Sequence, residues 1–265
     1  MERNFENITD YLKNKLGEDS IIREFSNGKT YFNYKGYIIT SRNNRYNINY
    51  DPEYTLVNNE DEQGDNTLEN GGFLIDINQG GIPKKHINSI KIQENIPDGY
   101  SVSYDVSEAK DETIMLYAVG DENNGYDVSL VSDRHTIKAP AFSNRLFYFC
   151  NKLTELDLSN LNTSNAISIY GMFQYCSNLT NLNLENLDTS KVENMGALFY
   201  GDRKNTELNL QNFDTRNVVD MNSMFGLCTD LKRINVGDLW KVNDNVDISN
   251  MFYNCGVNEV TYSKN

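Results

Sequence analysis

From residue 146 onward, hydrophobic positions recur along the chain with a period of 26 residues. Phe147, Phe173, Phe199 and Phe225 are 26 residues apart, and Phe252 follows after 27. Columns of leucine, isoleucine and valine accompany them, with polar residues in between. A period in the twenties predicts a solenoid, in which each repeat forms one turn and buries its apolar side against the neighbouring turns.

Each repeat also carries a short alternating run of the form L-x-x-L-x-L. In the first repeat, this alternation points Leu156 and Leu158 inward and Glu155, Asp157 and Ser159 outward. A period of two is typical of a strand with one buried face. The pattern therefore predicts one strand in each turn and a parallel sheet that runs through all the repeats.

The N-terminal part of the chain has a different pattern. Phe5, Ile8, Leu12 and Leu16 recur at steps of three and four residues, which predicts a helix with one apolar face. Four aromatic and β-branched runs follow, IIREF, TYFNY, YIITS and YNINY, and they predict a four-stranded meander. Further strand-like runs, FLIDIN, HINSIKI, SVSYDV, TIMLYAVG and YDVSLV, lead from there to the repeats.

The repeats resemble a known family. The stretch TELDLSNLNTSNAISIYGMFQYCSNLTNLNLENLDTSKVENM is similar to the BspA-like leucine-rich repeat, whose units read L-x-x-L-x-L-S-N-F-D-T-S-x-V-x-x-M-x-x-M-F-x-x-C. That class also occurs in mycoplasma surface lipoproteins. The likeness extends over residues 146–262. It implies extracellular adhesion and protein binding, and it brings no catalytic residues.

Pattern and resemblance together give the expected architecture. We expect a mainly β protein, with an N-terminal helix and an antiparallel β domain followed by a short leucine-rich-repeat solenoid with a parallel sheet. Residues 1–95 form the expected docking or assembly domain of helix and meander. Residues 96–140 form a β-rich lead-in that caps the solenoid, and residues 141–265 form the solenoid.

Some positions depart from the repeat pattern. Asp202 stands in the cysteine column, Asn205 replaces the leucine of the next column, and Lys241 replaces a recurring threonine. Because two of these changes put polar residues at core positions, we expect residues 201–205, GDRKN, to bulge out of the core in the third turn.

The four cysteines occupy one column of the repeats, at Cys150, Cys176, Cys228 and Cys255. Packing explains such a column, so we favour reduced core thiols. The alternative is a disulfide between neighbouring turns, Cys150 with Cys176 and Cys228 with Cys255, since stacked turns place Cα atoms about 5 Å apart. We expect no zinc site, because a single column cannot surround a metal tetrahedrally.

Little in the sequence points to catalysis or to a cofactor. The two histidines, His86 and His135, lie outside any nucleophile or metal motif, and no glycine-rich run has the lysine of a phosphate loop. The acidic run of residues 58–72 resembles the start of an EF-hand loop. However, Asn70 stands where a bidentate glutamate is needed. We therefore expect no enzyme activity, no bound metal and no cofactor.

Charge narrows the choice of partner. The chain has 38 acidic and 24 basic residues and a net charge of -14, which repels nucleic-acid phosphates and anionic lipid headgroups. No run approaches the roughly 20 apolar residues that a membrane helix needs. The first residues also lack the basic segment and apolar core of an export signal. Neither nucleic acid nor membrane is an expected partner.

The outward positions of the predicted strands form the candidate partner-binding face. They are mostly amides and acids, which favours a hydrogen-bonded or basic partner, a protein or a glycan on a cell surface. The alternative is that they are only solvated, as any solenoid in water requires. These residues are Glu155, Asp157, Asn181, Asn183, Glu185, Glu207, Asn209, Gln211, Arg233 and Asn235.

These features favour a non-enzymatic recognition or adhesion protein. Family members are usually exported, whereas no export signal is visible here. A bacteriophage virion component (tail, fibre or baseplate) reconciles the two facts, with residues 1–95 docking to other virion proteins, as a monomer or a homo-oligomer. The first alternative is a bacterial cell-surface adhesin of the lipoprotein type. The second is a purely structural virion spacer.

Overall fold

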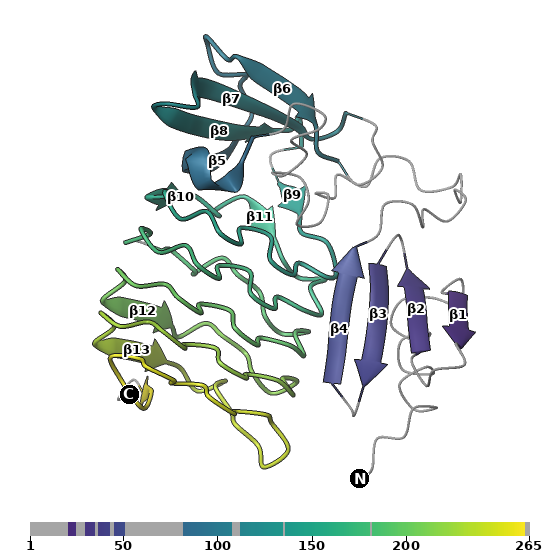
Figure 1. Ribbon diagram of the computed structural model, residues 1–265, viewed down its shortest axis with the longest axis vertical. Coiled ribbons are helices and arrows are strands. Elements are labelled where there is room, and N and C mark those ends of the chain that lie inside the picture. The colour runs from purple at the N-terminus through teal and green to yellow at the C-terminus, as the bar shows by residue number, and fades with distance from the viewer. Residues whose placement is uncertain are drawn as a thin grey trace. The chain divides into compact units, whose positions relative to one another are not determined.

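Figure 1 shows the computed structural model of the protein. It describes residues 82–107, 112–134, 136–180 and 182–262, together with the backbone of four strands between residues 21 and 50. The chain divides into two compact units, Met1–Gln63 and Gly64–Asn265. This division differs from the sequence-based boundaries after residues 95 and 140, which stay a prediction about folding units.

The first unit contains a four-stranded antiparallel sheet. Its strands are β1 (Ile21–Glu24), β2 (Thr30–Tyr34), β3 (Tyr37–Arg42) and β4 (Arg45–Tyr50), and each pairs with the next along the chain. The meander predicted from the aromatic and β-branched runs is therefore present. The predicted helix over residues 5–16 lies outside the described residues, as does the acidic run of residues 58–72.

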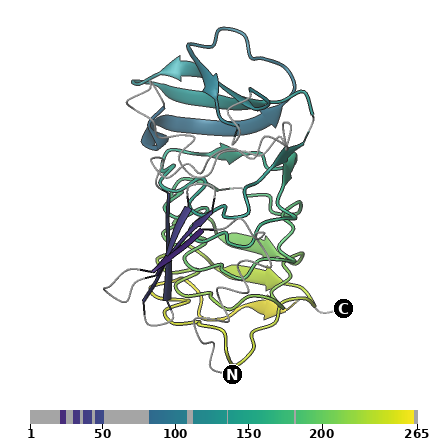
Figure 2. The same cartoon turned by 90° about the vertical axis from the view of Figure 1, so that its right-hand side faces the viewer.

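A mixed sheet opens the second unit and leads into the repeats. Its strands are β5 (Ile87–Gln93), β6 (Val102–Asp105), β7 (Met115–Asp121), β8 (Gly125–Val131) and β10 (Glu155–Leu156), in the order β10-β5-β8-β7-β6. The pairs β6-β7 and β7-β8 are antiparallel, whereas β5 runs parallel to both β8 and β10. Because β10 belongs to the first repeat, this sheet covers the open side of the first turn (Figures 1 and 2).

The repeats add two smaller parallel sheets. The first pairs β9 (Ile137–Lys138) with β11 (Leu161–Asn162). The second contains β12 (Glu207–Leu210), β13 (Arg233–Val236) and β14 (Thr261–Tyr262), from the last three turns. The turns lie stacked one on the next, as Figure 2 shows.

The predicted fold class is wrong. In the described part of the chain, the only helical segment is a three-residue 3-10 turn, Lys84–His86, and the strands lie in four small sheets, one of them mixed. The strand of the first repeat pairs with β5, and residues 182–184 of the second repeat form no strand. The parallel sheet expected through all the repeats is therefore interrupted.

The physical reason is that other backbone segments hold the turns together. Around four of the column phenylalanines, amides of one turn donate to carbonyls of the next, whereas amides elsewhere in the turn, such as Glu193 N to Ile167 O (2.8 Å), donate to the preceding turn. The bonds at the phenylalanines are Phe147 N to Met172 O (2.9 Å), Phe173 N to Leu198 O (3.0 Å), Phe199 N to Met224 O (2.9 Å) and Phe225 N to Met251 O (2.9 Å). Residues two places to either side repeat the pattern, and many of them have a positive φ, for example Tyr175 (61°) and Leu227 (59°).

The side chain of the buried Lys84 makes hydrogen bonds to backbone carbonyls of the first turn. Nζ of Lys84 donates to the carbonyl oxygens of Arg145 (3.2 Å) and Leu146 (3.4 Å), and Lys84 is only 6 % exposed. Burial lowers the pKa of its ammonium group to about 8. The lysine thus supplies donors to carbonyls that have no preceding turn.

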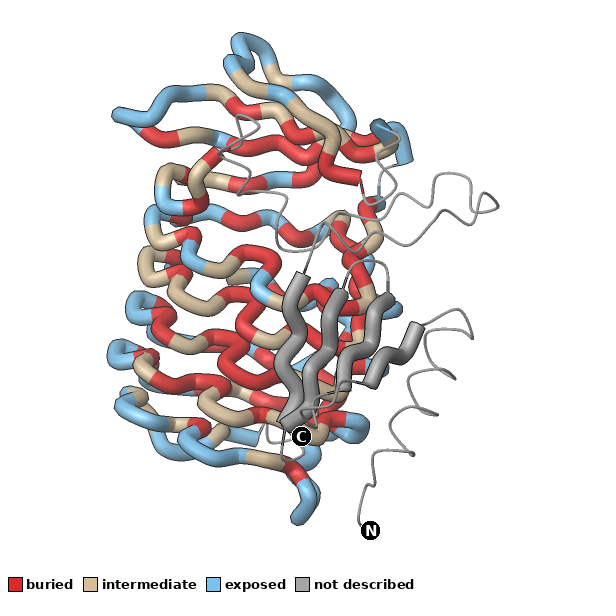
Figure 3. Tube along the Cα trace, turned by 45° about the vertical axis from the view of Figure 1, so that its right-hand side comes forward, coloured by how far each residue is buried: buried red, intermediate tan, exposed pale blue. Residues whose placement is uncertain are grey.

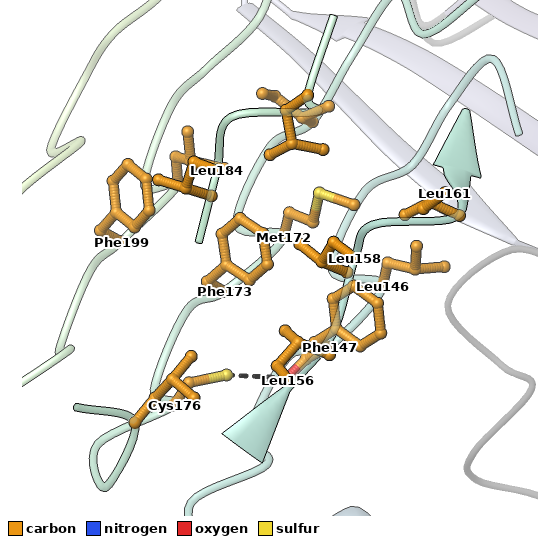
Figure 4. Close-up of a cluster of buried hydrophobic side chains, with 14 of the residues drawn as sticks. Leu146, Phe147, Leu156, Leu158, Leu161, Met172, Phe173, Cys176, Leu184 and Phe199 are labelled. Atoms are coloured by element: carbon orange, nitrogen blue, oxygen red, sulfur yellow. Dashed lines mark hydrogen bonds between the residues drawn. The ribbon is translucent and has the colours of Figure 1, made fainter. Parts of the chain in front are cut away.

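The column phenylalanines form the centre of the core. The rings of Phe147, Phe173, Phe199, Phe225 and Phe252 lie 5.6 to 5.8 Å apart from one to the next, with interplanar angles of 17° or less. Leucines from the alternating runs pack around them, as Figure 4 shows for the first turns. In Figure 3, buried stretches of the chain recur in successive turns. The sequence-based prediction of a shared interior column is confirmed.

Asparagine and aspartate make the corners of each turn. Their side-chain oxygens accept the amide two residues later, which is the geometry of an Asx turn. The same corner recurs in successive turns, for example at Asn162, Asp188 and Asp214, whose carbonyl or carboxylate oxygens accept amides at 2.9 to 3.1 Å. The high content of these residues is therefore structural.

Buried threonines join neighbouring turns next to these corners. The hydroxyl of Thr163 donates to Asp188 O (3.0 Å) and accepts the Asp188 amide (2.8 Å). Thr189 makes the same two bonds to Asp214. Since each hydroxyl satisfies both a donor and an acceptor of the next turn, these polar residues are stable in the interior.

The third turn does not bulge out as predicted. Asp202 and Asn205 are buried in their columns, with exposures of 1 % and 2 %. Nδ2 of Asn205 donates to Oδ2 of Asp202 at 2.5 Å. The two departures from the repeat pattern compensate each other in part through this bond, whereas Oδ1 of Asp202 is buried without a hydrogen-bond partner.

Gly201 provides a test of this packing. It has a φ of +76°, and an added Cβ would lie 2.5 Å from Cδ1 of Tyr175. We expect Gly201→Ala to lower the free energy of unfolding by about 2–3 kcal/mol, measured by urea unfolding. Gly99→Ala is the matched control, since Gly99 has a φ of +71° and open space around it. Its cost should be about 1 kcal/mol, and equal losses in the two variants would mean that the Tyr175 ring does not pack there.

Candidate binding surface

The structure places the described residues of the candidate face on the surface. Asn235 is half-buried, the other described members are exposed, and Asn181 lies outside the described residues. In β12 and β13 the outward positions alternate with Leu208, Leu210, Ile234 and Val236, which are buried. The parity predicted from the sequence is correct in these two strands.

Several members of this face already have a structural role. Oδ1 of Asp157, Asn183 and Asn209 accepts the amide two residues later, at 2.9, 3.0 and 3.3 Å. Nδ2 of Asn235 donates to Oε1 of Glu207 in the neighbouring turn at 2.5 Å. The amides and aspartate therefore form corners and cross-turn bonds. The glutamates at positions 155 and 185 are exposed members of the face outside this corner column.

A second surface feature is formed by aromatic side chains one or two residues after the column phenylalanines. We call it the aromatic strip, and it consists of Tyr148, Phe149, Tyr175, Tyr200 and Tyr253. The ring of Tyr175 lies 6.2 Å from Tyr148, 5.9 Å from Phe149 and 5.6 Å from Tyr200, edge to face in each case. Phe149 is 43 % and Tyr253 54 % exposed, and the other three are half-buried.

Small residues make room for the tyrosines of the strip. A Cβ at Gly226 would lie 2.7 Å from the Tyr200 ring, as one at Gly201 would collide with Tyr175. Burial, and then the neighbouring Tyr175 and Tyr253, raise the pKa of Tyr200. The glycines therefore leave room for the rings, and Tyr175 packs edge to face on Tyr148 and Tyr200.

A cation lies at the first turn of the strip. The guanidinium carbon of Arg145 is 5.3 Å from the centroid of the Tyr148 ring and 5.5 Å from that of Tyr170. Arg145 is exposed, so its charge stays available to a partner while the rings orient it.

Sequence reasoning missed the aromatic strip. Its members occupy the first or second position after the column phenylalanine, and the position changes from turn to turn. A search for one strict column therefore does not find them. The available signal was aromatic enrichment within two residues of every column phenylalanine except Phe225.

The chain has four cysteines and two histidines whose side chains could take part in chemistry. All four cysteines are free, and burial raises the pKa of Cys150 to about 12 and that of Cys176 well above its usual value. Sγ of Cys176 donates to the carbonyl of Phe147 at 3.1 Å (Figure 4). His86 is half-buried in the 3-10 turn, and His135 lies outside the described residues.

Two further kinds of feature, a metal-ligand cluster and a membrane-spanning helix, are absent from the part of the chain that the structure describes. No group of three or more His, Cys, Asp or Glu side chains is arranged to hold a metal ion in residues 82–262, apart from the gaps named above. Within the same part of the chain, no helix has the length and apolar character needed to cross a bilayer.

Comparison with known proteins gives one match. No curated protein and no solved structure matches the chain. Residues 142–264 match a family described as "Mycoplasma protein of unknown function, DUF285". This range coincides with the stacked repeats, so the repeats are similar to a mycoplasma protein family, as the resemblance seen in the sequence implied.

Proposed function

We propose that the protein is a non-enzymatic recognition protein of a bacterial cell surface, and that its repeats present the binding surface. The aromatic strip carries this proposal, because it places partly exposed and firmly held tyrosines beside an exposed polar face. Tyrosine combines a large apolar area with a hydrogen-bonding hydroxyl and is enriched at protein interfaces. Proteins and glycans are the partners that fit such a surface.

The family match favours this setting over a virion. The match is to a family of mycoplasma proteins, and the sequence resemblance to BspA-like leucine-rich repeats includes mycoplasma surface lipoproteins. Both point to a cellular protein of a bacterium. The alternative setting, a bacteriophage tail, fibre or baseplate, has no observation of its own in the described residues.

The relationship to the BspA-like repeats is part of the proposal. The recurring residue types have the same roles in successive turns. Leucine and cysteine pack in the core, asparagine makes the corner, and threonine makes the hydrogen bond to the next turn. A relative built on the same unit would need the same residue types at these places. The adhesion and protein binding associated with that family fit a stack of turns with a regular outer face.

The binding test uses the full chain and two surface variants. Fluorescently labelled protein is applied to cultured host cells and to glycan and protein arrays. We expect Phe149→Ser combined with Tyr253→Ser to weaken binding at least about tenfold, since aromatic anchors dominate interface energies. Glu155→Gln combined with Glu185→Gln should weaken it about two- to fivefold, because exposed charges at a rim contribute less.

A matched control separates binding from general surface effects. Ile96→Ser replaces an apolar side chain that is 54 % exposed and lies between β5 and β6, outside the repeats in the sequence. It should leave binding unchanged. If all the variants bind like the wild type, or if Ile96→Ser weakens binding as much as the aromatic double variant, the proposed surface is wrong.

A further inference from the structure

Cys228 and Cys255 differ from the other two cysteines. They occupy the same column in the last two turns, and the backbone holds them together on both sides. The amide of Leu227 donates to Tyr253 O at 2.7 Å, and that of Gly256 donates to Cys228 O at 3.0 Å. Turns stacked at a strand-like spacing of about 4.8 Å place Cα atoms within the range that a disulfide spans.

We propose that Cys228 and Cys255 form a reversible disulfide when the protein meets a peroxide, with Cys255 as the attacking thiolate. The proposal is independent of the binding function. It concerns a modification site within the last two turns, where the bond would fasten one turn to the next.

The surroundings of the two sulfur atoms are unequal. Cys228 is buried, and its Sγ lies 3.1 Å from the carbonyl oxygen of Phe199. Cys255 is half-buried, so small oxidants can reach it. The Cys228 thiol and the backbone of residues 256 and 257 lie close enough to favour a thiolate at Cys255.

These contacts also set the ionisation of the pair. The neighbouring Cys228 thiol lowers the pKa of Cys255 to about 7, although burial opposes this, and the amides of Val257 and Gly256 add to the lowering. The neighbouring Cys255 sulfur, followed by burial, raises the pKa of Cys228. One sulfur is therefore a nucleophile near neutral pH, and the other is its resolving partner.

The chemistry balances with hydrogen peroxide as the oxidant. The Cys255 thiolate attacks one peroxide oxygen, the O–O bond breaks, and a sulfenic acid and hydroxide form. The Cys228 sulfur then attacks the sulfenic sulfur, its thiol proton joins the leaving hydroxyl, and water departs. Two thiols lose two electrons in total, and the peroxide is reduced to water.

The other cysteines lack this arrangement. Cys150 and Cys176 are both buried, and burial raises the pKa of each. Asp202 occupies the column position between Cys176 and Cys228, so these two cysteines are not neighbours of each other in the column. The last two turns hold the one adjacent pair that combines access with a stabilised thiolate.

The experiment treats the full chain with hydrogen peroxide and counts thiols after unfolding, with glutathione as a positive control for the oxidant. We expect the wild type to fall from four thiols to two. Peptide mapping should find one cross-link, between Cys228 and Cys255, and dithiothreitol should restore all four thiols. Four remaining thiols, a different cross-link, or an intermolecular cross-link would overturn the proposal.

Variants identify the attacking sulfur. In Cys228→Ser, the sulfenic acid on Cys255 has no resolving partner, so dimedone should label Cys255. Cys255→Ser should form no cross-link, and dimedone should not label its Cys228. The control, Cys176→Ser, should still lose two thiols. Labelling of Cys228 in Cys255→Ser would overturn the assigned order of attack. Whether the cross-link forms at all is decided by the peptide map of the wild type, without any variant.

Discussion

Replacing Phe199 by alanine is expected to lower the free energy of unfolding of the second unit by about 4 kcal/mol. The side chain is fully buried, and its ring stacks on Phe173 at 5.7 Å and on Phe225 at 5.8 Å. The substitution removes both stacking contacts and leaves a cavity that the fixed spacing of the turns prevents from closing. Urea unfolding followed by fluorescence measures the loss, because the single tryptophan, Trp240, is buried in this unit.

Phe149→Ala is the matched control for this prediction. It makes the same chemical change two residues after a column phenylalanine, at a side chain that is 43 % exposed. Its expected cost is about 1 kcal/mol, since part of the ring already contacts water. Equal losses in the two variants would contradict the interior column.

The stability of the second unit is expected to fall by about 3–4 kcal/mol as the pH rises from 4 to 7.5. Burial raises the pKa of Asp202 from 3.8 to about 7. Below pH 3.8 the group is protonated in both the folded and the unfolded chain, so it carries no penalty. Between the two pKa values the unfolded chain loses the proton first, and stability therefore decreases with pH until about pH 7. Cys176 and Cys228 lie near enough to feel the charge that then forms.

Asp202→Asn is expected to remove this pH dependence. The amide keeps the size of the side chain but does not ionise, so urea unfolding at pH 4.5 and 7.5 should give nearly equal free energies. The matched control is Asp230→Asn, at an exposed position in the next turn, and it should keep the wild-type profile. The Arg216 guanidinium lowers the pKa of Asp214. This carboxyl therefore affects stability only below about pH 4, where it makes stability rise with pH. Parallel profiles for the wild type and Asp202→Asn would contradict the buried, proton-holding carboxyl.

The interior of the repeats could be predicted from the sequence because it depends on residue type. A buried column needs the same apolar side chain in each turn, so Phe147, Phe173 and Phe199 report the spacing directly. The outward parity of β12 and β13 follows from the same alternation. These features need only the period and the preference of apolar groups for the core.

The connections between the turns could not be predicted in this way. They are backbone hydrogen bonds, and they require left-handed φ values at residues such as Tyr175, Ala197 and Leu227, which give no sign of this in a sequence. The pairing of β10 with β5 depends on where the preceding sheet ends, so it is equally hidden. A continuous parallel sheet was the simplest expectation from alternation alone, and it was wrong.

The candidate site, too, could be predicted from the sequence only in part. Exposure of the polar face followed from strand parity, but the corner roles of Asp157, Asn183 and Asn209 depend on amides two residues later. In the third turn, Asp202 and Asn205 each violate the pattern when considered alone. Their hydrogen bond shows that the two polar side chains are paired in the core. Pairwise compensation of this kind requires coordinates.

The central claim is that the amides of the column phenylalanines join successive turns by donating to carbonyls of the next turn. Residue-resolved amide hydrogen exchange by NMR tests it most directly. We predict strong protection at Phe173, Phe199 and Phe225, whose amides reach the carbonyls of the next turn. The Phe252 amide has no acceptor among the described residues and should exchange at least about a hundredfold faster. Equal exchange at these four phenylalanines would contradict the claim.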